Sequence, residues 1–287
     1  MSSQNQKTIV ITGCSSGIGY ETAIACAKND YHVIATVRDP DSKIKLDEKI
    51  KYEKLRNIKI FELDLSDSKS IESFVKEIIS NYGEINYLFN NAGYMMMGSI
   101  EDTSIFDIRN QIETDLIGPI HLTKLLLPLM KKHDSMVINM SSIAGRVGWG
   151  YSGSYCTSKF GIEGFSESLR QELFLQGINV AIIEAGIVHT KFFDNMLARK
   201  INSSTNYAKG ALQLKAMIDK IKNEKKWKKP EEVADLIIKK IIPNGGSEFR
   251  YVIGTDAEFI TSILSSCDGN ISCIDEIMQY LTELYLK

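Results

Sequence analysis

Three side chains near the middle of the sequence have the types and the spacing needed to move a proton to or from an oxygen atom. Tyr155 and Lys159 lie four residues apart, so on a helix both side chains project from one face. A free tyrosine has a pKa near ~10, and a neighbouring ammonium group stabilises the phenolate and lowers that pKa. Ser142, thirteen residues before Tyr155, would hydrogen-bond the substrate oxygen. The trio predicts the interconversion of a carbonyl and an alcohol, with Tyr155 as the acid/base.

A glycine-rich stretch predicts the source of the hydride. Residues 12–19, TGCSSGIG, follow a β-branched run and precede a helical pattern. Glycines permit a tight turn and a close approach of the backbone to a pyrophosphate, and the first turn of the helix offers unpaired N–H groups. We therefore expect a dinucleotide cofactor at this turn. A strand-to-helix turn without a ligand is the alternative for this stretch. An ordinary pair of helical residues is likewise the alternative for Tyr155 and Lys159 when they are considered alone.

The residue after the second β-branched run bears on the choice of cofactor. A free ribose 2′-hydroxyl is usually bound by Asp or Glu at the end of this strand, whereas a 2′-phosphate requires a cation. Residues 32–37 end without a carboxylate and Arg38 follows directly, which favours NADP(H) over NAD(H). Ser15 and Ser16 would add hydroxyl donors to the same phosphate. A surface pair between Arg38 and Asp39 is the alternative, so NAD(H) stays open.

Short β-branched runs alternate with helical patterns and would bring these residues together. We expect strands at residues 7–12, 32–37, 58–62, 85–89, 136–140 and 179–184, and helices at 17–29, 41–55, 69–82, 104–132 and 154–176. This order predicts the α/β class, with a Rossmann-type, doubly wound parallel sheet in three α/β/α layers.

The last third of the chain has a different pattern. We expect residues 190–229 to form a helical substrate lid without a clear strand, followed by a helix at 230–242 and a short strand at 250–253. Residues 1–254 would then form the dinucleotide-binding and catalytic domain, and residues 255–287 a helical C-terminal tail.

Over about residues 7–254, the order of these motifs resembles the classical short-chain dehydrogenase/reductase family, whose signature turn is T-G-x-x-x-G-I-G. The resemblance implies that Asp64 and Leu65 contact the adenine, and that Lys159, beside Tyr155, also holds the nicotinamide ribose. It further implies cofactor contacts from the glycine-rich turn (Gly13, Ser15, Ser16, Gly17, Ile18 and Gly19) and from the N-N-A-G motif (Asn91, Ala92 and Gly93).

Two positions depart from the pattern of that family. Asp115 stands where the family has an Asn that helps to hold a water next to the lysine, so we expect Asp115 in the catalytic set and a reduced or pH-shifted turnover. Ala185 replaces the proline of P-G-x-x-x-T, which removes rigidity from the turn but no chemical group. Val188 and Thr190 remain in place to contact the cofactor.

Composition excludes several other classes of protein. With 34 basic and 36 acidic residues, the chain offers no reason to expect a nucleic acid or an anionic membrane as partner. A polar N-terminus and the absence of an apolar run near ~20 residues predict no secretory signal and no transmembrane segment. Five cysteines without C-x-x-C spacing predict free thiols and a cytoplasmic location, and the scattered histidines predict no metal site. The resemblance also implies a homodimer or homotetramer.

Apolar side chains near the expected site point to the substrate. They are Tyr94, Met95, Met96, Met97, Trp149, Tyr151, Phe192, Phe193 and Met196. An extended apolar molecule such as a steroid, retinoid or fatty carbonyl compound would fit them, although packing in the core or at an oligomer interface is the alternative. Two other functions compete with the reductase: a regulatory protein that senses NADP(H) without turnover, and a lyase or epimerase with a bound nicotinamide cofactor.

Overall fold

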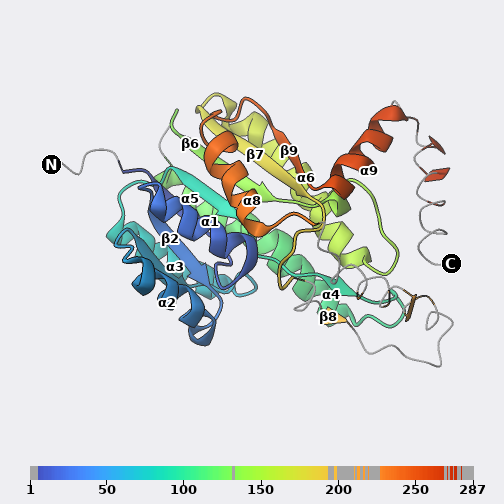
Figure 1. Ribbon diagram of the computed structural model, residues 1–287, viewed down its shortest axis with the longest axis horizontal. Coiled ribbons are helices and arrows are strands. Elements are labelled where there is room, and N and C mark those ends of the chain that lie inside the picture. Colours follow the sequence, from blue (N-terminus) through green and yellow to red (C-terminus); the bar gives the residue numbers. More distant parts are fainter. Residues whose placement is uncertain are drawn as a thin grey trace.

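A seven-stranded parallel sheet forms the centre of the protein in the computed structural model (Figure 1). The strand order is β3-β2-β1-β4-β6-β7-β9, and every neighbouring pair is parallel. The structure describes residues 6–130, 133–192, 197–198, 210, 212–213, 216, 219, 227–267, 270, 272–273, 275–276 and 279. The strands are β1 (Thr8–Ile11), β2 (His32–Val37), β3 (Ile58–Glu62), β4 (Tyr87–Asn90), β6 (Ser135–Met140), β7 (Ile178–Ala185) and β9 (Arg250–Ile253).

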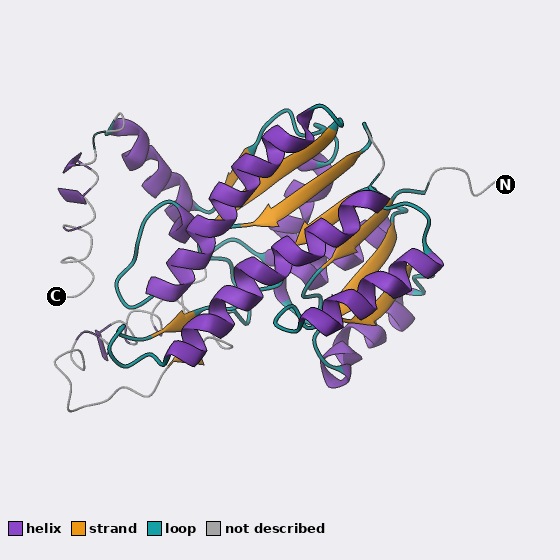
Figure 2. Ribbon diagram, turned by 180° about the vertical axis from the view of Figure 1, so that it is seen from behind, coloured by secondary structure: helices purple, strands orange, loops and turns teal. Residues whose placement is uncertain are grey.

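Helices cover both faces of this sheet, which confirms the three-layer α/β/α architecture (Figure 2). They include α1 (Gly17–Lys28), α2 (Ile44–Glu53), α3 (Ser68–Asn81), α6 (Gly153–Phe174) and α8 (Pro230–Leu236). Successive strand residues point to opposite faces, so Ile9 packs in the core beneath α1 and α8, whereas Val10 packs in the core beneath α3 and α6. Both cores need apolar side chains, which explains the nearly continuous β-branched runs.

The single helix expected over residues 104–132 is interrupted, so that prediction is wrong in its middle. The segment consists of α4 (Ile105–Ile112), a π-helical turn η2 (Glu113–Ile117), α5 (Gly118–Leu126) and a 3-10 turn η3 (Leu127–Leu129). Pro119 is the physical cause, because it has no N–H to donate to the carbonyl of Asp115 and its ring would collide with that carbonyl in a regular helix. Gly118 N–H instead donates to the carbonyl of Glu113. Asp115 therefore lies in a widened turn.

The segment after residue 190 contains a strand that its composition did not predict. β8 (Leu197–Ala198) pairs in parallel with β5 (Met96–Met97), which corrects the expectation of no strand between residues 190 and 229. The described residues of 210–219 are helical, and most of the other residues of the expected lid lie outside the described part of the chain. The C-terminal tail is helical in α9 (Thr255–Ser266), and most of residues 268–287 lie outside the described part of the chain. No helix among the described residues is long and apolar enough to cross a membrane.

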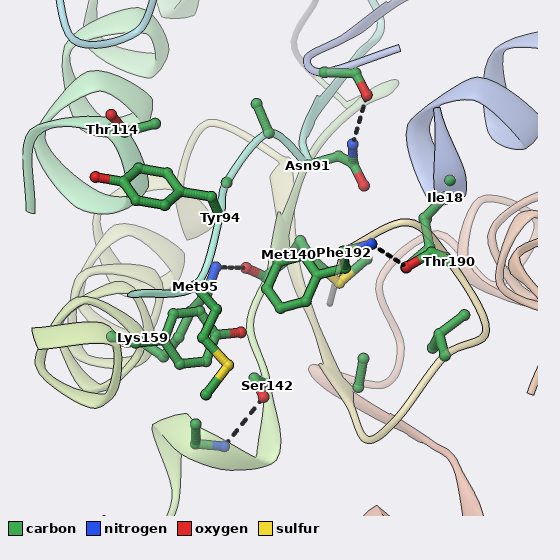
Figure 3. A pocket seen from close by; sticks show the side chains of 18 of the residues that line it. Ile18, Asn91, Tyr94, Met95, Thr114, Met140, Ser142, Lys159, Thr190 and Phe192 are labelled. Carbon is green, nitrogen blue, oxygen red and sulfur yellow. Dashed lines mark hydrogen bonds between the residues drawn. The ribbon is translucent and has the colours of Figure 1, made fainter. Parts of the chain in front are cut away.

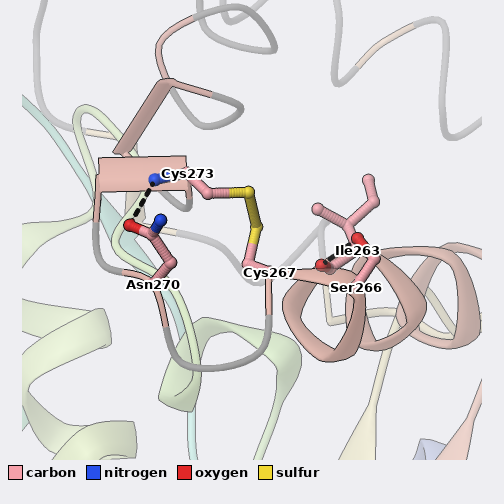
Figure 4. Close-up of a disulfide and its surroundings, with 5 residues drawn as sticks. All are labelled: Ile263, Ser266, Cys267, Asn270 and Cys273. Atoms are coloured by element: carbon pink, nitrogen blue, oxygen red, sulfur yellow. Dashed lines mark hydrogen bonds between the residues drawn. A yellow bond between two sulfur atoms is a disulfide. The ribbon is translucent and has the colours of Figure 1, made fainter.

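A disulfide closes the end of α9 (Figure 4). Cys267 and Cys273 are bonded, with Cα atoms 5.7 Å apart, whereas Cys14, Cys26 and Cys156 are free and buried. The expectation that all five cysteines are free thiols is therefore wrong for this pair. The chain turns back at the end of α9, where the Asn270 side-chain oxygen accepts the N–H of Cys273 at 3.3 Å, and this turn brings the two residues within disulfide distance. A separation of six residues matches none of the cysteine spacings, such as C-x-x-C, that indicate a pairing from the sequence.

Thiol counting checks this bond directly. Denatured, unreduced protein should take up an alkylating reagent at three cysteines, and protein reduced beforehand should take it up at all five. Cys267→Ser should instead give four alkylated thiols without reduction, because Cys273 is released. Five alkylated thiols in the unreduced wild-type protein would mean that the bond does not form.

Candidate active site

A large cavity lies at the carboxyl ends of the strands, the edge at which open α/β sheets bind their ligands. Its volume is about 1580 Å³. One side is formed by the glycine-rich turn between β1 and α1, which carries Ile18, and the opposite side carries Ser142 and Lys159 (Figure 3). Tyr155 lines the same cavity. The cavity therefore brings together the two sets of residues that the sequence analysis singled out.

The predicted catalytic trio meets at the wall of this cavity. Tyr155 and Lys159 project from the first turns of α6, and both are buried. Ser142 precedes the short helix η4 (Ile143–Gly145), and its hydroxyl accepts the N–H of Ala144 at 3.2 Å. Lys159 Nζ donates to the carbonyl of Met140 at 3.1 Å, at the end of β6 (Figure 3). The lysine is thus fixed next to the strand end that carries the serine.

The pKa of Tyr155 is shifted in the opposite direction to the one that the spacing predicts. Burial is the main cause that raises the pKa of Tyr155 above its usual value, and the negative charge of Asp115 raises it further. A hydrogen bond with the Ser142 hydroxyl lowers it only in part. Lys159 Nζ lies 5.6 Å from the centre of the tyrosine ring and faces the Asp115 carboxylate, so it does not produce the expected net lowering. Tyr155 is protonated at neutral pH.

Asp115 lies behind Lys159 and does not line the cavity. Its Oδ2 is 3.7 Å from Lys159 Nζ and has no hydrogen-bond partner among the described residues, while its Oδ1 accepts the N–H of Tyr94 at 3.2 Å. Burial raises the pKa of Asp115 to about 6, against the opposing effect of the Lys159 charge. Asp115 therefore contacts one member of the trio, Lys159, from outside the cavity, and its charge raises the pKa of another, Tyr155.

The glycine-rich turn has the backbone geometry needed to approach a pyrophosphate. Gly13 and Gly17 have φ angles of +73° and +63°, which L-residues with side chains rarely adopt. A Cβ on Gly13 would lie 2.8 Å from the Cα of Ala92. The N-N-A-G turn after β4 therefore packs directly on the glycine-rich turn. Asn91 Nδ2 fastens the two turns together by donating to the carbonyl of Thr12 at 2.8 Å. These observations fit a dinucleotide diphosphate at the start of α1.

Almost all residues expected to contact the cofactor line the cavity. They are Gly13, Ser15, Ser16, Gly17, Ile18, Arg38, Asp64, Leu65, Asn91, Ala92, Gly93, Tyr155, Lys159, Val188 and Thr190. Gly19 is not among the lining residues, and its expected cofactor contact stays a prediction. A Cβ there would lie 2.4 Å from both Asn91 Nδ2 and the carbonyl oxygen of Gly13.

Arg38 shows features of both alternatives for its role. It lines the cavity, its side chain is 76% exposed, and its Nε lies 4.0 Å from Asp39 Oδ2. Asp39 uses its other oxygen to cap the 3-10 turn η1 (Pro40–Lys43), accepting the N–H of Ser42 at 2.9 Å. The ion pair is therefore loose, and the carboxylate is engaged with the backbone. Ser42 also lines the cavity, and sequence reasoning missed it.

The substrate end of the cavity is lined mainly by aromatic and methionine side chains. Tyr94, Met95, Met97, Trp149, Tyr151 and Phe192 lie there as expected, whereas Met96 does not line this cavity because it points the other way from β5 and is 2% exposed. Phe193 and Met196 lie outside the described residues. The structure adds Phe106 of α4, Trp227, and Phe259 and Ile260 of α9. The sequence analysis missed the last two because it assigned α9 to a C-terminal tail separate from the catalytic domain.

Comparison with known proteins agrees with this geometry. The family model described as "short chain dehydrogenase" matches residues 7–200. An uncharacterised oxidoreductase of Bacillus subtilis, YusZ, is 38% identical over 253 residues, which cover 87% of this chain and 90% of that protein. The chain belongs to the short-chain dehydrogenase family. As a member of it, the protein is an oxidoreductase with a Rossmann-type fold.

Two further proteins resemble this one over nearly its full length. The 3-ketodihydrosphingosine reductase of Bacteroides thetaiotaomicron is 29% identical and covers 96% of this chain and 97% of its own. The crystal structure of a short-chain dehydrogenase from Streptomyces avermitilis, 26% identical, superimposes with a TM-score of 0.82 over 98% of this chain and 100% of that one. The similarity thus extends past residue 200 into the segment that carries α8, β9 and α9.

Proposed function

We propose that this protein is an NADP(H)-dependent oxidoreductase that interconverts a ketone or aldehyde and an alcohol of an apolar substrate. One observation carries the proposal: Ser142, Tyr155 and Lys159 meet in a cavity whose other wall is the glycine-rich turn. A dinucleotide bound along that turn would extend toward Tyr155, so that hydride and proton reach the same substrate bond from two sides.

The proposed mechanism assigns one task to each side chain. The bound NADPH supplies the hydride. Ser142 donates a hydrogen bond to the substrate oxygen and fixes its orientation, and Tyr155 donates the proton from its hydroxyl to that oxygen. Lys159 would hold the ribose hydroxyls, and its charge would favour the phenolate that remains, an effect smaller than those of burial and of Asp115, which raise the pKa of Tyr155. The raised pKa favours the phenol at neutral pH, which is the form that carbonyl reduction requires.

Arg38 supports NADP(H) over NAD(H). The 2′-phosphate would lie between Arg38 and Ser42, with Ser15 and Ser16 as further donors from the first turn. Asp39, the acid that could have bound a free 2′-hydroxyl, caps a helical turn instead.

Exchange of Arg38 tests this preference. Arg38→Gln should weaken NADPH binding by roughly 10- to 100-fold, because a charge-assisted hydrogen bond contributes about 1.5–3 kcal/mol, and should leave NADH binding unchanged. Fluorescence titration with both cofactors measures the effect, and Arg56→Gln, at an exposed position, is the matched control. An equal loss for NADH and NADPH would contradict a 2′-phosphate contact.

The apolar character of the cavity supports an extended substrate such as a fatty carbonyl compound, a retinoid or a steroid. Trp149, Phe192 and Phe259 are among the residues that line it, and the relative from B. thetaiotaomicron is, by its name, a 3-ketodihydrosphingosine reductase. Consumption of NADPH should be followed optically with aldehydes and ketones of increasing chain length, and the ratio of kcat to KM should rise with chain length. Tight NADPH binding without turnover of any of these compounds would favour the NADP(H)-sensing regulator.

The proposal extends to assembly and location. Exposed apolar side chains on α4 and α6 and in the turn between α4 and α5, Ile105, Ile117, Phe160 and Phe174, support a homodimer or homotetramer, which sedimentation equilibrium would measure. The three free buried thiols support a cytoplasmic location, where the Cys267–Cys273 bond of the isolated protein would be exposed to reduction.

A further inference from the structure

The loop after β7, which carries Val188 and Thr190, is held by the C-terminal part of the chain. Gly186 N–H donates to the carbonyl of Ile253 at 2.9 Å, and His189 N–H donates to the carbonyl of Lys228 at 2.7 Å. Between these two, Ile187 N–H donates to a side chain, the Oδ2 of Asp256, at 2.8 Å. Three of the four amides from residue 186 to residue 189 are thus bound to β9, α9 or the segment before α8.

Asp256 is packed against this loop and not merely close to it. A Cβ on Gly186 would lie 2.2 Å from Asp256 Oδ1, and one on Gly254 would lie 2.8 Å from the same atom. That oxygen is buried and has no hydrogen-bond partner among the described residues. The carboxylate lies in the first turn of α9, where the helix dipole stabilises a negative charge. Two glycines therefore make room for a carboxylate whose one described hydrogen bond fixes Ile187.

Ala185 explains why such a restraint is needed. Proline at this position would fix φ at the start of the loop, and alanine leaves that angle free to rotate in competing conformations. Ala185 pairs with Ile253 at the end of the sheet, but the hydrogen bond to β9 is donated by Gly186. A proline at 185 would therefore be compatible with that hydrogen bond. The proline would restrain the backbone at position 185, and Asp256 restrains it at Ile187, two residues further along the same loop.

We propose that Asp256 is a positioning residue that fixes the cofactor-contacting loop 186–190 and replaces the restraint that Ala185 does not provide. The cofactor part of this inference rests on the proposed function, because it takes Val188 and Thr190 to contact NADP(H). Asp256, Phe259 and Ile260 also share one face of α9 and all line the cavity. The same helix therefore forms the substrate wall and fixes the cofactor loop.

A double-mutant cycle tests the proposal with Asp256→Ala, Ala185→Pro and the double variant. Asp256→Ala should raise the Kd and the KM for NADPH about tenfold, the usual size of a hydrogen bond to a charged group, while kcat changes less than about threefold. Asp256→Asn keeps an oxygen acceptor and should bind NADPH nearly as the wild type does. In the Ala185→Pro background the Asp256→Ala loss should shrink to about threefold or less. Glu258→Ala, exposed on the first turn of α9, is the matched control.

Hydrogen exchange in the cofactor-free protein separates this proposal from the proposed function. The peptide that covers residues 186–190 should exchange faster in Asp256→Ala than in the wild type, and Ala185→Pro should restore much of the protection. Unchanged exchange in a variant that still folds would overturn the inference, as would an Asp256→Ala loss of NADPH affinity of the same size in both backgrounds. A wild-type protein that fails to bind NADPH would overturn the proposed function and the cofactor role of Asp256, whatever the exchange result.

Discussion

Replacing Tyr155 with phenylalanine is expected to lower kcat by roughly 100- to 10,000-fold, the contribution of a positioned acid/base, while NADPH still binds. The change removes one hydroxyl and keeps the ring, which packs 6.1 Å from the ring of Phe192 and is almost fully buried. The cavity should therefore keep its shape and its cofactor wall. What is lost is the proton donor at the point where Ser142 orients the substrate oxygen.

Tyr151→Phe is the matched control for this experiment. Tyr151 also lines the cavity, but it precedes α6 and is not paired with Lys159 at the helical spacing of four residues. Its kcat should stay within about threefold of the wild type, since no positioned proton transfer depends on it. Single-turnover measurements with NADPH and the best aldehyde or ketone would isolate the chemical step. If Tyr155→Phe kept more than about a tenth of the wild-type rate, another group would have to supply the proton, and the roles assigned above would fall.

Local motifs made much of the site predictable. The glycine-rich turn, Arg38, the Asn–Ala–Gly turn and the Ser142–Tyr155–Lys159 trio each follow or begin a regular element, and a parallel sheet brings all strand ends to one edge. Their chemistry is carried by residues close together in sequence. Position along the chain and hydrophobic period were therefore enough to place them.

The features that the sequence did not predict depend on contacts between distant residues. Asp256 reaches Ile187 across 69 positions, and only the pairing of β7 with β9 brings them together. The pKa of Tyr155 depends on its burial and on the charge of Asp115. Neither effect can be predicted from the spacing of residues in the sequence. The π-helical turn is an exception, because Pro119 already marks the helix interruption in the sequence and was not used.

Asp115→Asn is expected to shift the pH dependence of turnover to lower pH by about one unit, the usual effect of removing a nearby like charge. The Asp115 carboxylate raises the pKa of Tyr155, so asparagine lowers it. Alcohol oxidation needs the phenolate and rises with pH through that pKa, so the variant should oxidise alcohols about tenfold faster at neutral pH. Carbonyl reduction needs the phenol, so its decline with rising pH should also begin about one unit earlier.

The same substitution should change stability with a definite sign. The pKa of Asp115 is raised from 3.8 to about 6 in the folded protein, so the folded state resists ionisation that the unfolded state accepts. The free energy of unfolding of the wild type falls as the pH rises from the pKa of Asp115 in the unfolded protein to its pKa in the folded protein. Asparagine at position 115 does not ionise and avoids this loss. Asp115→Asn should therefore unfold at a higher denaturant concentration than the wild type above about pH 6, by up to roughly 3 kcal/mol, and match it near pH 4.

Glu113→Gln provides the control for both measurements, because Glu113 lies in the same π-helical turn but is exposed. It should leave the pH–rate profile and the pH dependence of unfolding unchanged. Rates should be measured in both directions from about pH 5 to 10, the interval that spans the pKa of Asp115 and the approach to that of Tyr155. Identical profiles for the wild type and Asp115→Asn would show that the Asp115 charge does not reach Tyr155, and the buried Asp115–Lys159 pair would then have to be neutralised in the folded protein.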